Sequence, residues 1–217
     1  MHIKTVLFDL DGTITDSAPG IVNSVAYTLD KYGIPYNDKK ELEVFIGPPL
    51  AKQFELFCGF SEEESYRAVD VYREYYSDRG IFENSVYEGI VPMLKRLKED
   101  GYKVVVATSK PERMAKIIAE HFDIEKYFDF IGGAHMDGRR TDKKEVIEYV
   151  LANSNVSDHD EVIMVGDRKY DVIGAHELGI KCIAVLFGYG SKEELTEAGA
   201  DYMAETPEKV ADIIEAL

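Results

Sequence analysis

Short apolar runs alternate with amphipathic stretches over most of the chain. The runs are rich in valine and isoleucine and too short for helices, so they predict buried strands. The stretches between them repeat apolar residues at the spacing of one helix face. This alternation predicts an α/β fold in which helices cover both faces of a parallel sheet. The expected strands are residues 6–8, 103–107, 128–132, 161–165 and 181–186.

The helices expected between these strands begin and end at recognisable signals. A helix over residues 89–100 ends at Gly101, and the next opens at Pro111, because proline suits the first helical position. Short helices near the end of the sequence begin after Ser191 and at Thr206-Pro207, where a hydroxyl side chain can cap the helix. Further helices are expected over residues 142–152 and up to residue 178.

A long helical block interrupts the alternation directly after the first expected strand. It runs from about residue 17 to residue 80 and contains Ser61 followed three positions later by Glu64, which is typical of a helix start. We interpret this block as an inserted, small, all-helical cap domain. The expected domains are a catalytic core of residues 1–15 and 83–217, and a cap of residues 16–82.

Composition and charge limit the class of protein. The 217 residues are 45% hydrophobic and 30% charged, which is typical of a globular chain. With 25 basic and 41 acidic residues the net charge is −16, so we expect no binding to nucleic acid or to an anionic membrane surface. An anionic ligand would need a local cation that reverses this field at its site.

The cysteines and the first residues indicate a cytoplasmic protein. Cys58 and Cys182 are too few and too far apart for a disulfide framework or a cysteine-based zinc site, which suits a reducing compartment. The first residues show no secretory signal, and no stretch approaches the roughly 18 apolar residues of a membrane-spanning helix.

Polar residues suited to phosphoryl chemistry follow several of the expected strands. Ligands of open parallel sheets bind at the carboxyl ends of the strands, so these side chains are expected to meet there. Carboxylates without histidine or cysteine suit Mg²⁺, and a carboxylate can also attack phosphorus while a second one moves protons. A hydroxyl and an ammonium complement the remaining phosphoryl oxygens. The candidates are Asp9, Asp11, Thr108, Ser109, Lys143, Asp167 and Asp171.

The order of these residues resembles a known family. Asp9-Leu10-Asp11-Gly12-Thr13, after a short apolar strand, resembles the first motif of the haloacid dehalogenase superfamily. Thr108, Lys143 before Glu145-Val146-Ile147, and the segment 166–171 follow in that family's order. The resemblance covers essentially the whole chain and extends to the phosphoglycolate-phosphatase-like branch. It implies a Rossmann-like parallel sheet core with an inserted helical cap of the C1 type.

The resemblance implies roles for the acidic residues. Asp9 would be the nucleophile and a Mg²⁺ ligand. Asp11 would be the general acid and base, and its main-chain carbonyl would also bind the metal. Asp167 would be a further metal ligand, and Asp171 would hold a water on the metal.

It also implies the residues that bind the phosphoryl group. Thr108 would donate a hydrogen bond to it, and Ser109 is a second candidate, with helix capping as its alternative role. Lys143 would neutralise the phosphate, and is preferred to the adjacent Lys144 because it fits the Lys-x-Glu-Val-Ile spacing.

One turn in the expected cap is a candidate for substrate choice. Gly47 and Pro49 belong to a rigid Gly-Pro-Pro turn with two alternative interpretations, a turn aimed at the active site or an ordinary connection between helices. Lys52 follows it closely and is a candidate partner for a second anionic group of the substrate.

The function expected from these patterns is a Mg²⁺-dependent phosphatase. Its partner would be a small phosphorylated metabolite, hydrolysed through an aspartyl-phosphate intermediate. Phosphoglycolate, a nucleoside 5′-monophosphate and a sugar phosphate remain open as substrates. The alternatives on the same machinery are a β-phosphoglucomutase-like phosphomutase and a pyrophosphatase. A receiver-type signalling domain fits less well, because the paired acids already end the first strand and a large insertion follows. The oligomeric state is left open, with a monomer favoured.

Overall fold

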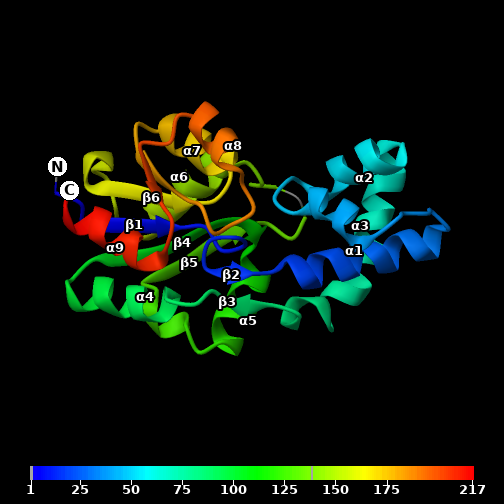
Figure 1. Ribbon diagram of the computed structural model, residues 1–217, viewed down its shortest axis with the longest axis horizontal. Coiled ribbons are helices and arrows are strands. Elements are labelled where there is room, and N and C mark those ends of the chain that lie inside the picture. Colours follow the sequence, from blue (N-terminus) through cyan, green and yellow to red (C-terminus); the bar gives the residue numbers. More distant parts are fainter. Residues whose placement is uncertain (1, 138) are drawn as a thin grey trace. The chain divides into compact units, whose positions relative to one another are not determined.

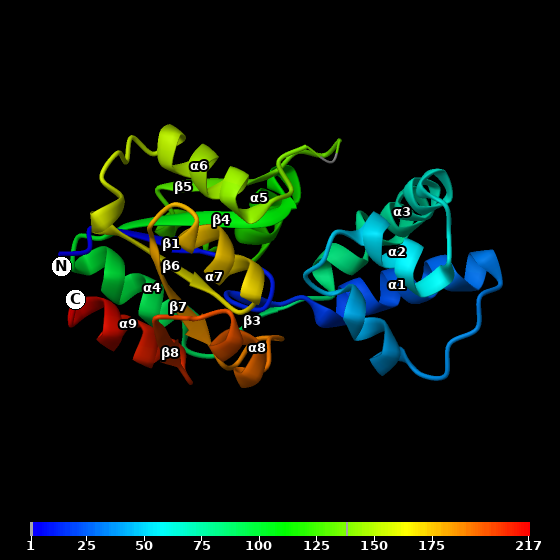
Figure 2. The same ribbon diagram turned by 90° about the horizontal axis from the view of Figure 1, so that it is seen from above.

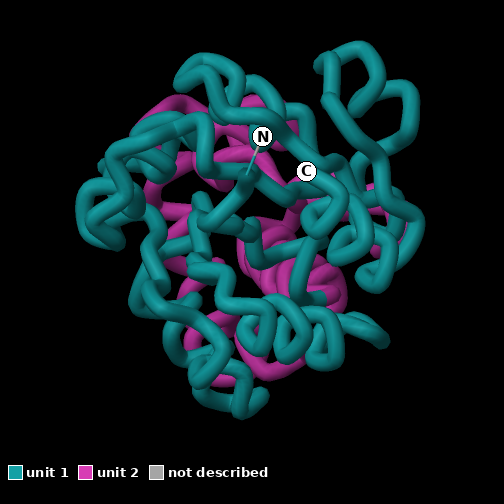
Figure 3. The backbone as a smooth tube through the Cα atoms, turned by 90° about the vertical axis from the view of Figure 1, so that its left-hand side faces the viewer, with its two compact units in different colours: residues 1–15, 86–217 teal, residues 16–85 magenta. Residues whose placement is uncertain are grey.

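A computed structural model describes residues 2–137 and 139–217, and the chain divides into two compact units (Figure 3). Unit 1 comprises Met1–Thr15 and Val86–Leu217, and unit 2 comprises Asp16–Ser85. The sequence analysis put the return to the core between residues 82 and 83 rather than between Ser85 and Val86. The two boundaries between the units fall inside the two-residue strands β2 (Thr15–Asp16) and β3 (Ser85–Val86), which pair with each other.

Unit 1 contains a six-stranded sheet of order β5-β4-β1-β6-β7-β8, in which every neighbouring pair is parallel (Figure 1). The four residues of β1 are all buried, as expected of a central strand covered on both faces. This sheet confirms the predicted α/β class. The strands are β1 (Thr5–Phe8), β4 (Lys103–Pro111), β5 (Phe130–Ala134), β6 (Val162–Gly166), β7 (Lys181–Val185) and β8 (Tyr202–Ala204).

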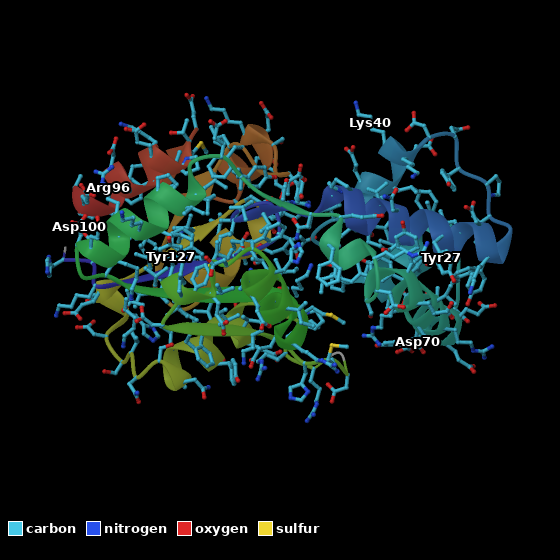
Figure 4. The ribbon with its side chains drawn as sticks, turned by 90° about the horizontal axis from the view of Figure 1, so that it is seen from below. Tyr27, Lys40, Asp70, Arg96, Asp100 and Tyr127 are labelled. Carbon is cyan, nitrogen blue, oxygen red and sulfur yellow. The ribbon has the colours of Figure 1, made fainter. Side chains whose placement is uncertain are left out.

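Helices cover both faces of this sheet (Figure 1). Apolar residues of α6, α7 and α8 pack with residues of β1, β4, β6 and β7 in one buried cluster. On the other face α4 lies beside α9, where Arg96 donates to Asp212 at 3.1 Å and to Glu215 at 2.6 Å (Figure 4). The helices are α4 (Ile90–Glu99), α5 (Glu112–His121), α6 (Lys143–Asn153), α7 (Lys169–His176), α8 (Lys192–Glu197) and α9 (Pro207–Glu215), with 3-10 turns η3 (Glu125–Tyr127) and η4 (His159–Glu161).

The carboxyl end of β4 differs from the expectation. The prediction that Pro111 opens a helix is wrong, because Pro111 still pairs with Ala134 of β5 and the helix starts after it. The pairing register shifts between Thr108 and Pro111, so the strand bulges there. A β-carbon on Gly133 would lie 2.4 Å from the carbonyl oxygen of Lys110, so β5 needs a glycine beside the bulge.

Unit 2 is built from helices that pack on one another (Figure 2). The helix start predicted at Ser61 is present as a capping box, with Ser61 and Glu64 each satisfying a backbone N–H of the other. Labelled charged side chains such as Lys40 and Asp70 point outward (Figure 4). The elements are α1 (Ala18–Tyr32), η1 (Lys39–Phe45), α2 (Leu50–Cys58), α3 (Glu62–Tyr76) and η2 (Gly80–Phe82). Among the described helices of both units, none is long and apolar enough to cross a membrane.

Candidate active site

Several of the predicted residues meet at the carboxyl edge of the sheet in unit 1. Asp9 follows β1 and Asp167 follows β6, and these two strands are neighbours. Asp171 lies in the first turn of α7, and Lys143 is the first residue of α6. Sequence-distant residues therefore converge because each one directly follows a strand or begins a helix at the same edge.

Lys143 links two of the carboxylates. Its Nζ lies 2.8 Å from Oδ1 of Asp9 and 2.7 Å from Oδ1 of Asp171, and it also donates to the carbonyl of Ala107 at 3.1 Å. The ammonium is almost fully buried, so these three acceptors replace the water it has lost. The neighbouring Lys144 instead pairs with Glu177, at 3.5 Å. The structure therefore places Lys143, and not Lys144, in the cluster.

Carboxylate oxygens of Asp167 and Asp171 also accept hydrogen bonds from outside the cluster. Oδ1 of Asp167 accepts from the Thr13 hydroxyl at 3.3 Å, and Oδ2 accepts from the backbone N–H of Tyr189 at 2.8 Å. Oδ2 of Asp171 accepts from the backbone N–H of Arg168 at 3.0 Å. These contacts fix the side-chain directions of both acids.

The three acids can hold a metal ion. Asp9, Asp167 and Asp171 each offer one oxygen, and these oxygens lie within 4.8 Å of one another. All three residues are buried, and the Lys143 ammonium contacts two of their three carboxylates. A buried set of oxygen ligands with excess negative charge fits a hard divalent cation such as Mg²⁺.

Burial shifts the pKa values of this cluster. Burial raises the pKa of Asp9 to about 6, although Lys143 opposes the shift, and Asp171 and Asp11 add to it. The pKa of Asp167 is raised well above its ordinary value by burial, then by the charges of Asp171 and Asp9. Burial would lower the pKa of Lys143, but Asp171 and Asp9 outweigh it and raise that pKa. The carboxylates thus crowd one another, which favours a bound cation.

Asp11 makes a contact that the sequence analysis missed. Its two carboxylate oxygens lie 2.9 and 2.8 Å from Nζ of Lys110, and the Lys110 side chain is almost fully buried. Strand alternation does not predict this contact, because the register of β4 shifts between Thr108 and Pro111.

The two hydroxyl candidates on β4, Thr108 and Ser109, differ in burial. Thr108 is buried at the site edge, and its Oγ1 accepts from the backbone N–H of Lys110 at 3.2 Å. Ser109, the next residue, is only half-buried. The phosphate-binding roles of both residues stay predictions.

A glycine-rich loop after β7 encloses Asp167 and was also missed. A β-carbon on Gly188 would lie 2.3 Å from Cβ of Asp167 and 2.3 Å from the carbonyl oxygen of Gly12. The next residue, Tyr189, supplies the N–H that Asp167 accepts. The Gly-Tyr-Gly sequence at residues 188–190 was the available signal for such a close approach.

The predicted specificity residues belong to unit 2. Gly47 and Pro49 are exposed, and Gly47 has a φ of 101°, which favours glycine. Lys52 lies in α2 with a largely exposed side chain, and pairs with Glu55 at 2.6 Å. Their roles in substrate choice stay predictions.

Comparison with known proteins gives a consistent family. A sequence model of the haloacid dehalogenase-like hydrolases matches residues 6–185. The 5′-nucleotidase of Pseudomonas aeruginosa is 43% identical over 195 residues, covering 90% of this chain and 88% of that protein. Tyrosine-protein kinase PtkA of Mycobacterium tuberculosis is 42% identical over 188 residues, covering 86% of this chain and 63% of that protein. The crystal structure of a predicted phosphatase from Clostridium acetobutylicum is 45% identical, with a TM-score of 0.96 and full coverage of both chains.

These similarities confirm two predictions from the sequence, the family and the class of enzyme. The family match spans both the paired acids at Asp9 and Asp11 and the acids at Asp167 and Asp171. The phosphatase class of enzyme is confirmed by the family and by relatives of that class. The chain belongs to the haloacid dehalogenase-like hydrolase family.

Proposed function

We propose that this chain is a Mg²⁺-dependent phosphatase that hydrolyses nucleoside 5′-monophosphates through an aspartyl-phosphate on Asp9. The observation that carries the proposal is that Asp9 lies 2.8 Å from the Lys143 ammonium and offers an oxygen within 4.8 Å of oxygens of Asp167 and Asp171. The substrate class is taken from the relative named 5′-nucleotidase, which is 43% identical over most of both chains. Phosphoglycolate and sugar phosphates are the next classes to test.

The buried acids would hold the metal. Side-chain oxygens of Asp9, Asp167 and Asp171 form the candidate ligand set, and the main-chain carbonyl of Asp11 is a further proposed ligand. Mg²⁺ bound there supplies positive charge that offsets the negative charge of the phosphoryl oxygens. Lys143, which contacts both Asp9 and Asp171, contributes a second positive charge, and Thr108 a hydroxyl donor.

Asp9 and Asp11 have different roles in the two chemical steps of the proposed reaction. In the first, a carboxylate oxygen of Asp9 bonds to phosphorus, the bond from phosphorus to the ester oxygen breaks, and Asp11 gives that oxygen a proton. In the second, Asp11 takes a proton from a water whose oxygen bonds to phosphorus. The bond between phosphorus and Asp9 breaks, which releases inorganic phosphate and restores the Asp9 carboxylate.

Release of inorganic phosphate tests this proposal. The substrates are nucleoside monophosphates, phosphoglycolate, hexose phosphates and pyrophosphate, each with Mg²⁺ and with EDTA. Asp9→Asn should lower the turnover by on the order of 10⁴-fold or more, because an amide cannot attack phosphorus. Asp123→Asn removes an acid whose side chain is 84% exposed and should leave turnover unchanged. Appreciable release by Asp9→Asn would rule out Asp9 as the nucleophile.

Two further reactions are separated in the same experiment. A phosphomutase would need a sugar bisphosphate and would release no net phosphate. Because one relative is named a tyrosine-protein kinase, ATP should also be tested as a phosphoryl donor. Formation of phosphotyrosine is the readout of that test. Transfer to tyrosine without phosphate release would replace the phosphatase proposal by a kinase.

A further inference from the structure

The Lys110 ammonium contacts both oxygens of the Asp11 carboxylate. We propose that Lys110 is a positioning residue that holds Asp11 in the orientation needed for its proton transfers. The inference rests on the proposed function, because it assigns Asp11 the general acid and base of that reaction. It gives the site two lysines with separate tasks, Lys143 for the nucleophile and Lys110 for the proton-transferring acid.

The contact is specific because both of its distances are short and both partners are shielded. The two Nζ to oxygen distances are 2.9 and 2.8 Å, and the side chains of Lys110 and Asp11 are 6% and 17% exposed. An ammonium removed from water to this extent needs an anionic partner, so the pair is expected to persist. It joins residues that are 99 positions apart in the sequence.

The bulge in β4 fixes where Lys110 stands. The register of β4 against β5 shifts between Thr108 and Pro111, and Lys110 lies inside that interval. The backbone N–H of Lys110 donates to the Thr108 hydroxyl oxygen, and Gly133 leaves the space for the Lys110 carbonyl. The lysine therefore starts from a fixed backbone position, which lets its ammonium hold Asp11 in one place.

Without that ammonium the half-buried Asp11 carboxylate would be able to turn towards water. Proton transfer needs hydrogen-bond distance to the reacting oxygen, and a displacement of about 1 Å can cost a factor of about 100 in rate. Lys110→Met should therefore lower kcat by about 10- to 100-fold. The KM and the half-saturating Mg²⁺ concentration should stay unchanged, because the metal ligands and Lys143 are untouched.

A double-mutant cycle tests whether Lys110 acts through Asp11. Phosphate release is measured for the wild type, Lys110→Met, Asp11→Asn and the double variant. The second substitution should add no further loss of kcat once Asp11 is an amide. Lys110→Arg should restore part of the rate, since a guanidinium also donates to both carboxylate oxygens. The matched control is Lys103→Met at the other end of β4, where the ammonium donates to the Ser154 carbonyl at 2.7 Å.

Several outcomes would overturn the inference. A raised KM with unchanged kcat would make Lys110 a substrate-binding cation, and multiplied losses in the double variant would show that it acts apart from Asp11. If Lys110→Met does not fold, Lys110→Gln carries the same cycle. NMR of lysine ammonium groups tests the contact without turnover, because Asp11→Asn should shift or broaden the Lys110 signal. If the Lys110 signal shifts but the wild type releases no phosphate, the proposed function is refuted and the contact is not. If the wild type releases phosphate and Lys110→Met keeps the same turnover, only the inference about Lys110 is refuted.

Discussion

The ion pairs of the site in unit 1 and those on the helices of unit 2 have similar distances but different surroundings. Lys143 approaches Asp9 to 2.8 Å with side chains 5% and 12% exposed. Lys31 approaches Glu74 to 2.6 Å with side chains 45% and 51% exposed. Water screens the second pair and solvates its partners when it breaks, whereas breaking the first leaves a buried charge alone. Burial, and not distance, therefore decides which pairs the protein depends on.

Removing the Lys143 ammonium is the strongest test of this difference. Lys143→Met should lower the free energy of unfolding by about 3–5 kcal/mol, because two buried carboxylates lose their shared partner. Turnover should also fall, by on the order of 10³-fold, through the lost charge beside the phosphoryl group. Urea unfolding at pH 7 in EDTA and phosphate release measure the two effects.

The adjacent lysine is the control for this substitution. Lys144→Met removes an ammonium whose side chain is 40% exposed and which lies 3.5 Å from Glu177. It should leave both the urea midpoint and the turnover close to those of the wild type. Equal losses in the two variants would show that the site does not depend on burial of Lys143.

The sequence predicts the parts of the site that local patterns determine, and not those that depend on pairing between distant strands. Asp9 and Asp167 could be predicted because each directly follows an apolar strand, which is a local pattern. The choice of Lys143 over Lys144 came from the spacing of the family that the sequence resembles. The contact between Lys110 and Asp11 could not be predicted, since it depends on a bulge set by pairing with β5. Strand β8 was missed because it has three residues and only one of them is buried.

Loss of a proposed metal ligand should have the next largest effect. Asp167→Asn should raise the half-saturating Mg²⁺ concentration by on the order of 100-fold, because one of three buried carboxylates becomes neutral. Calorimetric titration of Mg²⁺ measures this without turnover. In the wild type, Mg²⁺ at about 100 times its dissociation constant should add about 2.7 kcal/mol to the free energy of unfolding. Asp123→Asn should bind Mg²⁺ as the wild type does, and an unchanged titration in Asp167→Asn would remove that residue from the metal site.

The raised pKa of Asp9 predicts a pH dependence of stability in metal-free protein. Burial raises this pKa from 3.8 to about 6, so the folded protein binds more protons than the unfolded chain between these values. The contribution of Asp9 is therefore most favourable below pH 3.8 and is lost as the pH rises through about 6. Unfolding in EDTA across this range should show a shallower fall in stability for Asp9→Asn than for the wild type. Asp167 contributes in the same direction in both proteins, so equal slopes would contradict the assignment to Asp9.

The smallest effect is expected for an exposed pair of unit 2. Arg67 contacts Glu63 one helical turn earlier in α3, with side chains 64% and 80% exposed. Arg67→Met should leave the urea midpoint within replicate scatter and the turnover unchanged, because water replaces the lost partner of Glu63. Unfolding in low and in high salt provides the check, since screening removes any contribution that remains at low salt. A loss of stability as large as that of Lys143→Met would mean that solvent exposure does not weaken ion pairs in this protein. The charges of the active site would then need an explanation other than burial.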